Sequence, residues 1–150
     1  MSAIETPEQT TTTAQSAKVL YTAKTHTTGG RSGASRTSDG RLDVKLSSPT
    51  VAGTGTNPEQ LFAVGWSACY QSAIELEARK KHITLSPDSA VDAEIDLCSG
   101  NTGYFLRARL NVSLPGIDRE IAETLIEAAH HTCPYSKATH GNIDVVTTLV

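Results

Sequence analysis

The sequence predicts an α+β domain in which antiparallel sheets carry helices on one face. Three observations lead to this fold class. Segments typical of strands open and close the chain, at residues 18–48 and 142–150. Helical spacing of apolar residues marks 57–82 and 118–131, whereas 90–114 alternates apolar and polar residues around a turn. The predicted order is therefore β-β-β-α-β-β-α-β.

Length and composition limit the classes of protein to consider. The chain has 150 residues, which suits one domain with a real core. Its net charge of −3 argues against binding to nucleic acid. It has no apolar run long enough to span a membrane, and its polar start lacks the basic and apolar parts of a secretory signal. We therefore expect a cytoplasmic protein that binds no membrane.

The first 17 residues differ in composition from the rest. Residues 1–17 include the run TTTT and almost no large apolar side chain, so they cannot bury enough surface to offset their ordering entropy. We expect a disordered tail at 1–17 and one domain at 18–150. The domain contains three cysteines, Cys69, Cys98 and Cys133. An odd number without a secretory signal argues against a structural disulfide framework.

The N-terminal half of the domain reads as a three-stranded meander. Residues 18–27, 34–39 and 42–48 have strand composition. The glycine-rich turn GGRSG at 29–33 joins the first two strands, and Asp39-Gly40 is a hairpin signal before the third. A loop at 49–58 then leads to the first helix.

The first helix has a clear start. Asn57 is a favoured N-cap residue and Pro58 suits the first helical position. The helix is expected to end near residue 82. Its predicted apolar stripe consists of Leu61, Gly65, Ala68, Ser72 and Leu76.

The C-terminal half combines an alternating strand pair with a second helix. Residues 90–98 and 104–114 alternate strictly, which predicts an antiparallel pair with one buried face. Asp118 is expected to cap the second helix and Pro134 to stop it, before a last strand at 142–150. The expected apolar stripe of that helix is Ile121, Leu125, Ala128 and Ala129.

Two of the cysteines suggest redox chemistry. A lone cysteine such as Cys69 is more often a small core residue. Cys133, however, stands at a helix end before a proline, and two cysteines at the ends of elements suit a peroxidatic and resolving pair. Such a site needs a cation near its thiolate, for which Arg31 is a candidate, and Glu59 could hold that arginine. Their simpler interpretations are a solvated turn arginine and an acid favoured by the helix dipole.

Other classes of function stay open on the residues alone. His130, His131, Cys133 and His140 could supply metal ligands, although their spacing matches no zinc pattern. A small-molecule carrier without catalysis would need only a pocket. Cys98 falls on the polar face of its strand and is interpreted as a spectator thiol.

Three motifs resemble one known family. GGR after the first strand, GTNPEQLFAVGWSACY and CPYSKATHGNIDV are similar to the organic hydroperoxide resistance proteins of the Ohr/OsmC family, over residues 18–150. The resemblance implies a thiol peroxidase of oxidative stress defence that reduces alkyl and fatty-acid hydroperoxides to alcohols. It also implies an intertwined homodimer with no bound cofactor. Its external reductant would be dihydrolipoamide or a lipoylated protein.

The resemblance also implies a role for each candidate residue. Cys69 resembles the peroxidatic cysteine and Cys133 the resolving one, so the pair would form a disulfide. Arg31 resembles the thiolate-stabilising arginine and Glu59 the carboxylate that positions it. Apolar neighbours of Cys69 on the helix are expected to line a pocket that favours alkyl hydroperoxides. These neighbours are Phe62, Val64 and Trp66.

Helix geometry raises a difficulty for a site within one chain. Along a continuous helix, Glu59 and Cys69 lie about 15 Å apart in rise and are turned by roughly 80°. An arginine held by Glu59 would then reach the Cys69 of a second chain, so we expect each site to be shared between two chains. The alternative is a bend at 57–60 that folds Glu59 back.

Overall fold

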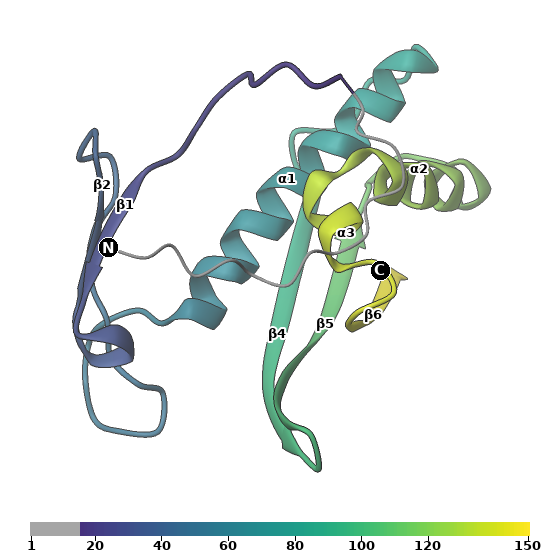
Figure 1. The fold of residues 1–150 in the computed structure, drawn as a ribbon. Coiled ribbons are helices and arrows are strands. Elements are labelled where there is room, and N and C mark those ends of the chain that lie inside the picture. Colours follow the sequence, from purple (N-terminus) through teal and green to yellow (C-terminus); the bar gives the residue numbers. More distant parts are fainter. Residues whose placement is uncertain (1–15) are drawn as a thin grey trace.

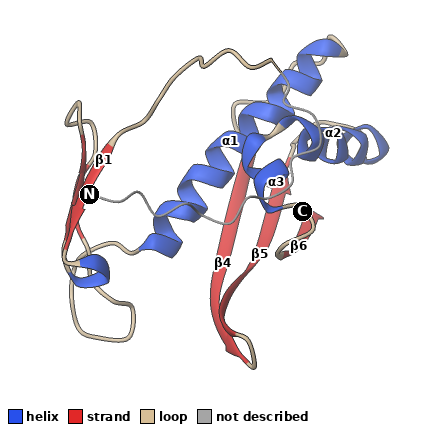
Figure 2. Cartoon of the chain, viewed as in Figure 1, coloured by secondary structure: helices blue, strands red, loops and turns tan. Residues whose placement is uncertain are grey.

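The computed structural model describes residues 16–150, which form two three-stranded sheets and three α-helices (Figures 1 and 2). The expected disordered tail lies almost entirely outside the described residues. In chain order the elements are β1 (Thr25–Thr28), the 3-10 turn η1 (Gly30–Ser32), β2 (Ala34–Thr37), β3 (Asp43–Lys45), α1 (Pro58–Lys80), β4 (Ala90–Gly100), β5 (Gly103–Ser113), α2 (Arg119–Thr132), α3 (Pro134–Thr139) and β6 (Asp144–Leu149).

The first sheet is the predicted antiparallel meander, with the order β1-β2-β3. Gly29 and Gly30 have φ of +72° and +56°, conformations that glycine adopts without steric cost, and they form the turn after β1. The predicted first strand at 18–27 is too long, since residues 16–24 form no strand and run extended and exposed before β1 (Figure 2). Residues 18–24 have strand composition, but no neighbouring strand in the described part of the chain pairs with them, so they do not become part of the sheet.

This first sheet stands apart from the rest of the chain (Figure 1). All four residues of β1 are exposed, and β2 and β3 are at most half-buried. A small sheet needs an apolar layer on at least one face to be stable. Within one chain, the described residues do not supply that layer.

The second sheet has the order β4-β5-β6. The predicted antiparallel pairing of β4 with β5 is confirmed, with Glu94 opposite Arg109 and Ala93 opposite Leu110. On its polar face the Arg109 guanidinium donates two hydrogen bonds of 2.8 Å to the Asp96 carboxylate. The expectation of antiparallel strands throughout is wrong for β6, which runs parallel to β5. Two helices, α2 and α3, stand between β5 and β6, and a helical crossover of this kind returns a strand in the same direction.

The first helix begins as predicted but buries a different face. The Gln60 amide donates to Asn57 Oδ1 at 2.9 Å, Pro58 follows the cap, and α1 runs without interruption to Lys80. The predicted stripe is wrong as the core-facing one, because Ala68, Ser72 and Leu76 are exposed. The apolar core-facing residues are Trp66, Tyr70, Ala73, Ile74 and Ala78. Both faces of α1 carry apolar residues, so spacing alone selected the wrong one.

The second helix matches the prediction, but the chain does not leave helical structure after it. Asp118 caps α2 through hydrogen bonds from two backbone amides. Pro134 ends α2 and also begins α3, a helix that the sequence prediction missed. Proline is favoured at a first helical position, where its missing N–H costs nothing. Cys133, with φ −69° and ψ 120°, is therefore the corner between two helices.

The core lies between the helices and the inner face of the second sheet. Its largest fully buried side chains are Trp66, Tyr70, Ile74, Leu110, Leu125, Val112 and Cys133. In α2 the predicted stripe is partly right, since Leu125 and Ala129 are buried but Ile121 is 43% exposed.

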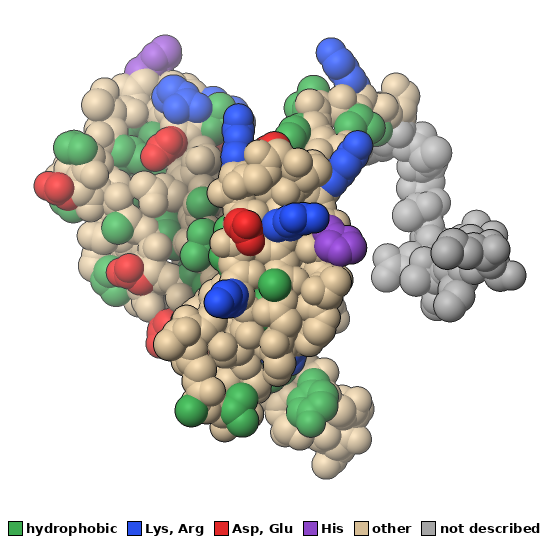
Figure 3. Space-filling model, turned by 90° about the vertical axis from the view of Figure 1, so that its left-hand side faces the viewer, with side chains coloured by type: hydrophobic (Ala, Val, Ile, Leu, Met, Phe, Trp, Pro, Cys, Tyr) green, Lys and Arg blue, Asp and Glu red, His purple; other side chains and the backbone are tan. Residues whose placement is uncertain are grey.

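None of the helices in residues 16–150 is both long and apolar enough to cross a bilayer. On the face drawn in Figure 3, basic side chains are scattered among acidic ones rather than gathered in one patch.

Candidate active site

Two thiols face each other between α1 and the corner that joins α2 to α3. The Cys133 thiol donates to Cys69 Sγ, and the two sulfur atoms lie 3.3 Å apart, although 64 residues separate them in sequence. Both cysteines are free. Cys133 is fully buried, whereas Cys69 is half-buried. A disulfide bond is about 2.05 Å long, so a small movement joins the two sulfurs.

The surroundings of Cys69 act on its pKa in opposite directions. Burial raises the pKa of the thiol, because an apolar environment disfavours the thiolate. A hydrogen bond from the Tyr135 backbone N–H lowers the pKa, and Cys133 raises it. Tyr135 follows Pro134 in the first turn of α3, where backbone amides have no helical partner and are free to donate. The net shift is upward.

Arg31 and Glu59 form a bidentate ion pair. Arg31 Nη1 donates to Glu59 Oε2 at 2.8 Å, and Nη2 donates to Oε1 at 2.6 Å. The arginine comes from the glycine turn η1 and the carboxylate from the first turn of α1. Hydrogen bonding to Arg31 lowers the pKa of Glu59, and the same bond raises the pKa of Arg31. The Arg31 side chain is 44% exposed, so solvent still reaches it beside Glu59.

The ion pair and the thiol pair lie at different places in one chain. Because α1 is continuous, Glu59 and Cys69 are about 15 Å apart along its axis. The alternative of a bend at 57–60 is wrong, since Pro58 already belongs to the regular helix. Within residues 16–150, no cation is among the groups that shift the Cys69 pKa.

A pocket of about 290 Å³ adjoins the ion pair. It is lined by Arg31, Pro58, Glu59, Phe62, Leu97, Tyr104, Phe105 and Leu106. Of the three residues expected to line a substrate pocket, Phe62 does so here. Val64 is 66% exposed on the opposite side of α1, and Trp66 is fully buried. Val64 points away because two positions along a helix turn by about 200°. Trp66, one turn after Phe62, lies on the same side and packs edge-on against the Phe62 ring, with the ring centroids 5.6 Å apart, but it is buried deeper in the core.

The alternative metal site does not form among the described residues. Residues 16–150 contain no group of three or more histidine, cysteine or acidic side chains able to hold a metal ion. Both ring nitrogens of His130 bond hydroxyl groups, those of Ser136 and Thr147. His131 is exposed and lies 3.7 Å from the Glu127 carboxylate. Adjacent histidines on a helix point in different directions, which separates these two.

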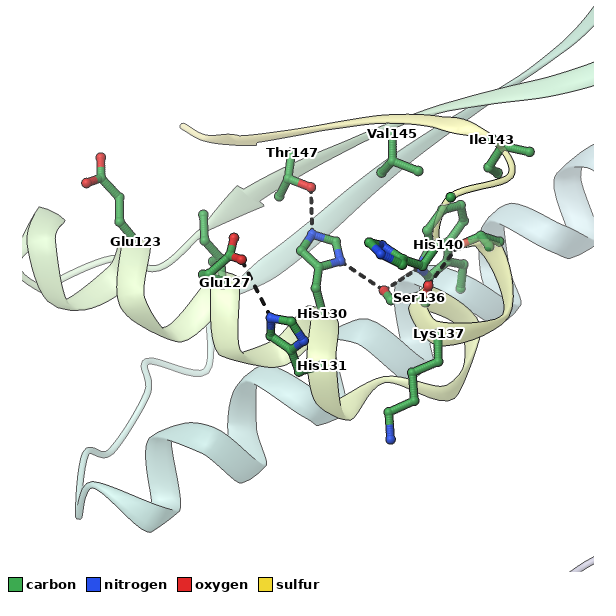
Figure 4. Close-up of a pocket in the computed structure, with 14 residues that line it drawn as sticks. Glu123, Glu127, His130, His131, Ser136, Lys137, His140, Ile143, Val145 and Thr147 are labelled. Atoms are coloured by element: carbon green, nitrogen blue, oxygen red, sulfur yellow. Dashed lines mark hydrogen bonds and ion pairs between the residues drawn. The ribbon is translucent and has the colours of Figure 1, made fainter. Parts of the chain in front are cut away.

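Sequence reasoning missed several residues around the thiols. These are Tyr135, whose amide reaches Cys69, and Tyr70 and Ser136, which lie at the Cys133 corner. His130, which the sequence suggested only as a metal ligand, lies at the same corner. A larger cavity, of about 750 Å³, opens beside them between α2, α3 and β6 (Figure 4). The signal for Tyr135 was present, since a proline directly after Cys133 marks a possible new helix start.

The chain is similar to known proteins over most of its length. The family model described as OsmC-like protein matches residues 51–148. The organic hydroperoxide resistance protein of Xanthomonas axonopodis pv. citri is 43% identical over 136 residues, 88% of this chain and 96% of that protein. The organic hydroperoxide resistance protein OhrB of Bacillus subtilis is 42% identical over 131 residues, 84% of this chain and 95% of that protein.

Solved structures give the same relation. The crystal structure of Bacillus subtilis OhrB superposes with a TM-score of 0.84 and covers 88% of this chain and all of its own, 100%. An organic hydroperoxide resistance protein from Elizabethkingia anophelis is 38% identical, has a TM-score of 0.82, and covers 89% of this chain and 98% of its own. The predicted α+β fold class agrees with these structures.

The thiol geometry leads to a first test. Diamide, a mild thiol oxidant, is expected to join Cys69 to Cys133 within one chain, because their sulfurs are already 3.3 Å apart. Cys98 lies on β4 outside this pair, so Cys98→Ser should give the same disulfide at the same rate. A non-reducing peptide map by mass spectrometry identifies the bond. A major disulfide that contains Cys98 would contradict the assignment of Cys98 as a spectator.

Proposed function

Because the chain belongs to the OsmC-like protein family, we propose that it is a thiol peroxidase that reduces organic hydroperoxides to alcohols and serves in oxidative stress defence. The observation that carries the proposal is the pair of free thiols, Cys69 and Cys133, with sulfurs 3.3 Å apart. One of the two is half-buried and so can meet a substrate, and the other is fully buried. This division suits a peroxidatic and a resolving role.

In the proposed reaction, the Cys69 thiolate attacks one oxygen of the hydroperoxide. The O–O bond breaks, the alkoxide leaves and takes a proton to become the alcohol, and Cys69 becomes a sulfenic acid. The Cys133 thiol then attacks Cys69 Sγ, so the disulfide forms and the hydroxyl leaves with the thiol proton as water. The peroxide gains two electrons and the two thiols lose two. An external dithiol restores both thiols by exchange with the disulfide.

The pocket beside the ion pair supports an apolar organic substrate. Its lining combines leucine and aromatic side chains with the Arg31–Glu59 pair. An alkyl chain gains free energy from burial against such a surface, whereas hydrogen peroxide has no apolar surface to bury. We therefore propose alkyl and fatty-acid hydroperoxides as substrates. For the reductant we propose dihydrolipoamide or a lipoylated protein, because a dithiol resolves a mixed disulfide within one molecule.

We further propose that the active protein is a homodimer with each site shared between two chains. Three observations support this. The continuous helix α1 keeps Glu59 about 15 Å along its axis from Cys69. The sheet β1-β2-β3 carries Arg31 in the turn between its first two strands. Within the described part of its own chain, no other element covers either face of this sheet. The outward face of α1 exposes apolar Val64 and Leu76.

A second copy of the chain accounts for all three observations. Two α1 helices packed antiparallel, start against middle, bring the partner's Glu59 close to Cys69. Small residues on the exposed side of α1, Ala68 and Ser72, allow close approach of two helices. The partner's Arg31 then supplies the cation that Cys69 lacks in one chain. Its guanidinium would offset the effect of burial and lower the thiol pKa.

The roles of the two cysteines are tested by replacing each one. Cys69→Ser is expected to abolish consumption of cumene hydroperoxide in the presence of dihydrolipoamide. Cys133→Ser should still undergo the first oxidation and then accumulate sulfenic acid or its over-oxidised products, because no thiol resolves it. Mass spectrometry after one equivalent of hydroperoxide distinguishes the species. Equal loss of the first oxidation in both variants would overturn the roles, and wild-type protein that consumes no hydroperoxide would overturn the activity.

The role of Arg31 is tested through the reactivity of Cys69. Arg31→Ala should raise the pKa of Cys69 and slow its oxidation, since the thiolate loses its cation. Arg31→Lys should restore the rate only in part, because an ammonium cannot make the planar double contact with Glu59. Thiol alkylation rates against pH, measured in a chain with Cys98→Ser and Cys133→Ser, report the Cys69 pKa. An unchanged titration curve in Arg31→Ala would exclude the arginine as the activating group.

The shared site is tested with mixed dimers. Co-expressed Cys69→Ser and Glu59→Ala chains, each with a different affinity tag, give dimers in which one site receives both defects and the other neither. Two inactive chains should therefore yield activity once mixed dimers are purified. A matched control joins Cys69→Ser to Cys133→Ser. Because both thiols of a pair come from one chain, each site of that mixed dimer keeps one defect in either arrangement of the ion pair, and no activity should return. Mixed Cys69→Ser and Glu59→Ala dimers no more active than their parents would exclude a site shared between chains.

A further inference from the structure

The position of the Cys133 sulfur depends on the corner between α2 and α3. Cys133 is both the C-cap of α2 and the N-cap of α3, so a change in the angle between these helices moves its side chain. Backbone hydrogen bonds run from the Cys133 amide to Ala129 and from the Lys137 amide to Cys133, one into each helix. Neither of them crosses from α2 to α3, so other contacts must fix the angle.

A chain of side-chain hydrogen bonds crosses this corner (Figure 4). His130 precedes Cys133 by one turn of α2, and Ser136 follows it by one turn in α3. His130 Nδ1 and Ser136 Oγ are 3.0 Å apart, and His130 Nε2 lies 2.8 Å from Thr147 Oγ1 on β6. The Trp66 indole, from α1, donates to the same Ser136 Oγ at 3.1 Å. The side chains of His130 and Ser136, which flank Cys133, therefore connect α1, α2, α3 and β6.

The chemistry of the four groups lets every hydrogen bond of this chain form at once. An indole N–H only donates, so Ser136 Oγ accepts from Trp66 and uses its proton or its second lone pair toward His130 Nδ1. His130 Nε2 takes the complementary role toward Thr147 Oγ1, so a neutral ring satisfies both contacts in either tautomer. Burial lowers the pKa of His130, which agrees with a neutral ring.

The same region also fixes Cys69 relative to the corner. Trp66 and Tyr70 lie on either side of Cys69 in α1, three residues before it and one after it. The Tyr70 hydroxyl donates to the Ile126 carbonyl of α2 at 2.6 Å, and its ring packs 4.5 Å from the His130 ring. Thus α1 is attached to α3 through Trp66 and to α2 through Tyr70. The sulfurs of Cys69 and Cys133 meet between these two attachments.

We propose that Ser136 and His130 are positioning residues for the resolving step, because their hydrogen bond holds the α2–α3 corner at the angle that keeps Cys133 Sγ against Cys69. The inference rests on the proposed peroxidase function and concerns the fate of the Cys69 sulfenic acid. That species either reacts with Cys133 or meets a second hydroperoxide and becomes a sulfinic acid. Reaction with Cys133 is fast only while the two sulfurs are held at near-attack distance.

The neighbouring cavity explains why this hydrogen bond matters. His130, Ser136 and Thr147 all line the cavity of about 750 Å³ between α2, α3 and β6. An imidazole released by Ser136 therefore has space into which it can turn. Their polar side-chain atoms already have partners within the network, so we assign the cavity no ligand.

The experiment measures how hydroperoxide is partitioned between disulfide and over-oxidation. Wild-type protein, Ser136→Ala, His130→Asn and His130→Gln are treated with increasing cumene hydroperoxide without reductant, and Cys69 sulfinic acid is quantified by mass spectrometry. For Ser136→Ala we expect half-maximal over-oxidation at a hydroperoxide concentration lower by on the order of tenfold. The second-order rate of the first oxidation, followed by stopped flow, should stay within about twofold, because the resolving thiol takes no part in that step.

The two histidine variants supply a graded comparison. An asparagine amide takes the place of Nδ1 and can still hydrogen-bond Ser136, whereas a glutamine amide reaches the place of Nε2 and keeps only the contact with Thr147. His130→Asn should therefore over-oxidise less readily than His130→Gln. The comparison is between two variants that both lack the imidazole and differ only in which contact remains. It therefore tests the positioning role even if Ser136→Ala does not fold.

A matched control comes from the same short helix. Thr139, also buried in α3, donates its hydroxyl only to carbonyls of its own helix, Tyr135 and Ser136. Thr139→Val should leave the partition unchanged. Equal over-oxidation in Ser136→Ala and Thr139→Val, or His130→Asn more sensitive than His130→Gln, would overturn the positioning role alone. Wild-type Cys69 that is not oxidised at all would instead overturn the proposed function on which the role rests.

Discussion

The uninterrupted course of α1 is the constraint on which the other features depend. Asn57 and Pro58 start the helix at a fixed residue, and regular hydrogen bonding then sets the distance between every pair of positions along it. Glu59 is therefore held far from Cys69, although both are needed in the proposed site. A more flexible segment could have brought the two together within one chain. A rigid helix instead separates the end that carries Glu59 from the middle that carries Cys69. In the proposed dimer, a second copy of the chain brings the two together.

The unusual distribution of apolar residues follows from the same constraint. A surface helix normally has one apolar stripe and one polar face. In α1, Trp66, Tyr70 and Ile74 face the core, while Val64 and Leu76 are exposed on other sides. The exposed sheet β1-β2-β3 shows the same imbalance, since a three-stranded sheet with both faces open is not expected to be stable. In the proposed dimer, the helix face and the sheet face that one chain leaves open are covered by the other.

The sequence predicts features that depend on local chemistry better than features that depend on contacts. Asn57, Pro58 and Asp118 mark the helix starts correctly, because capping involves residues only a few positions apart. Strict alternation in β4 and β5 likewise identifies a pair with one buried face. The parallel direction of β6 was missed because it depends on the path of the two helices, α2 and α3, that connect β5 to β6. The predicted core face of α1 was wrong because the spacing of apolar residues cannot decide which of two apolar faces is buried.

The same distinction between local motifs and long-range contacts applies to the candidate site. The motifs around Arg31, Glu59, Cys69 and Cys133 give the proposed reacting groups by resemblance. The structure places the two thiols together and the two ions together. Ser136 and His130 could not have been found this way, since serine and histidine near a helix end have many ordinary roles. Their proposed role depends on the corner at which Pro134 ends α2 and begins α3.

The thiol chemistry connects these parts. Within one chain, burial and the neighbouring Cys133 raise the Cys69 pKa, and the Tyr135 amide only partly offsets them. At neutral pH such a thiol is even less ionised than a free cysteine, whose pKa is about 8.5. Any cation that activates it has to arrive from outside the described chain. In the proposed dimer, the contact that covers the outward face of α1 also delivers the partner's Arg31, so assembly and activation are the same event. An unassembled chain then keeps its thiols together but largely protonated, and it reacts slowly with peroxide until it finds its partner.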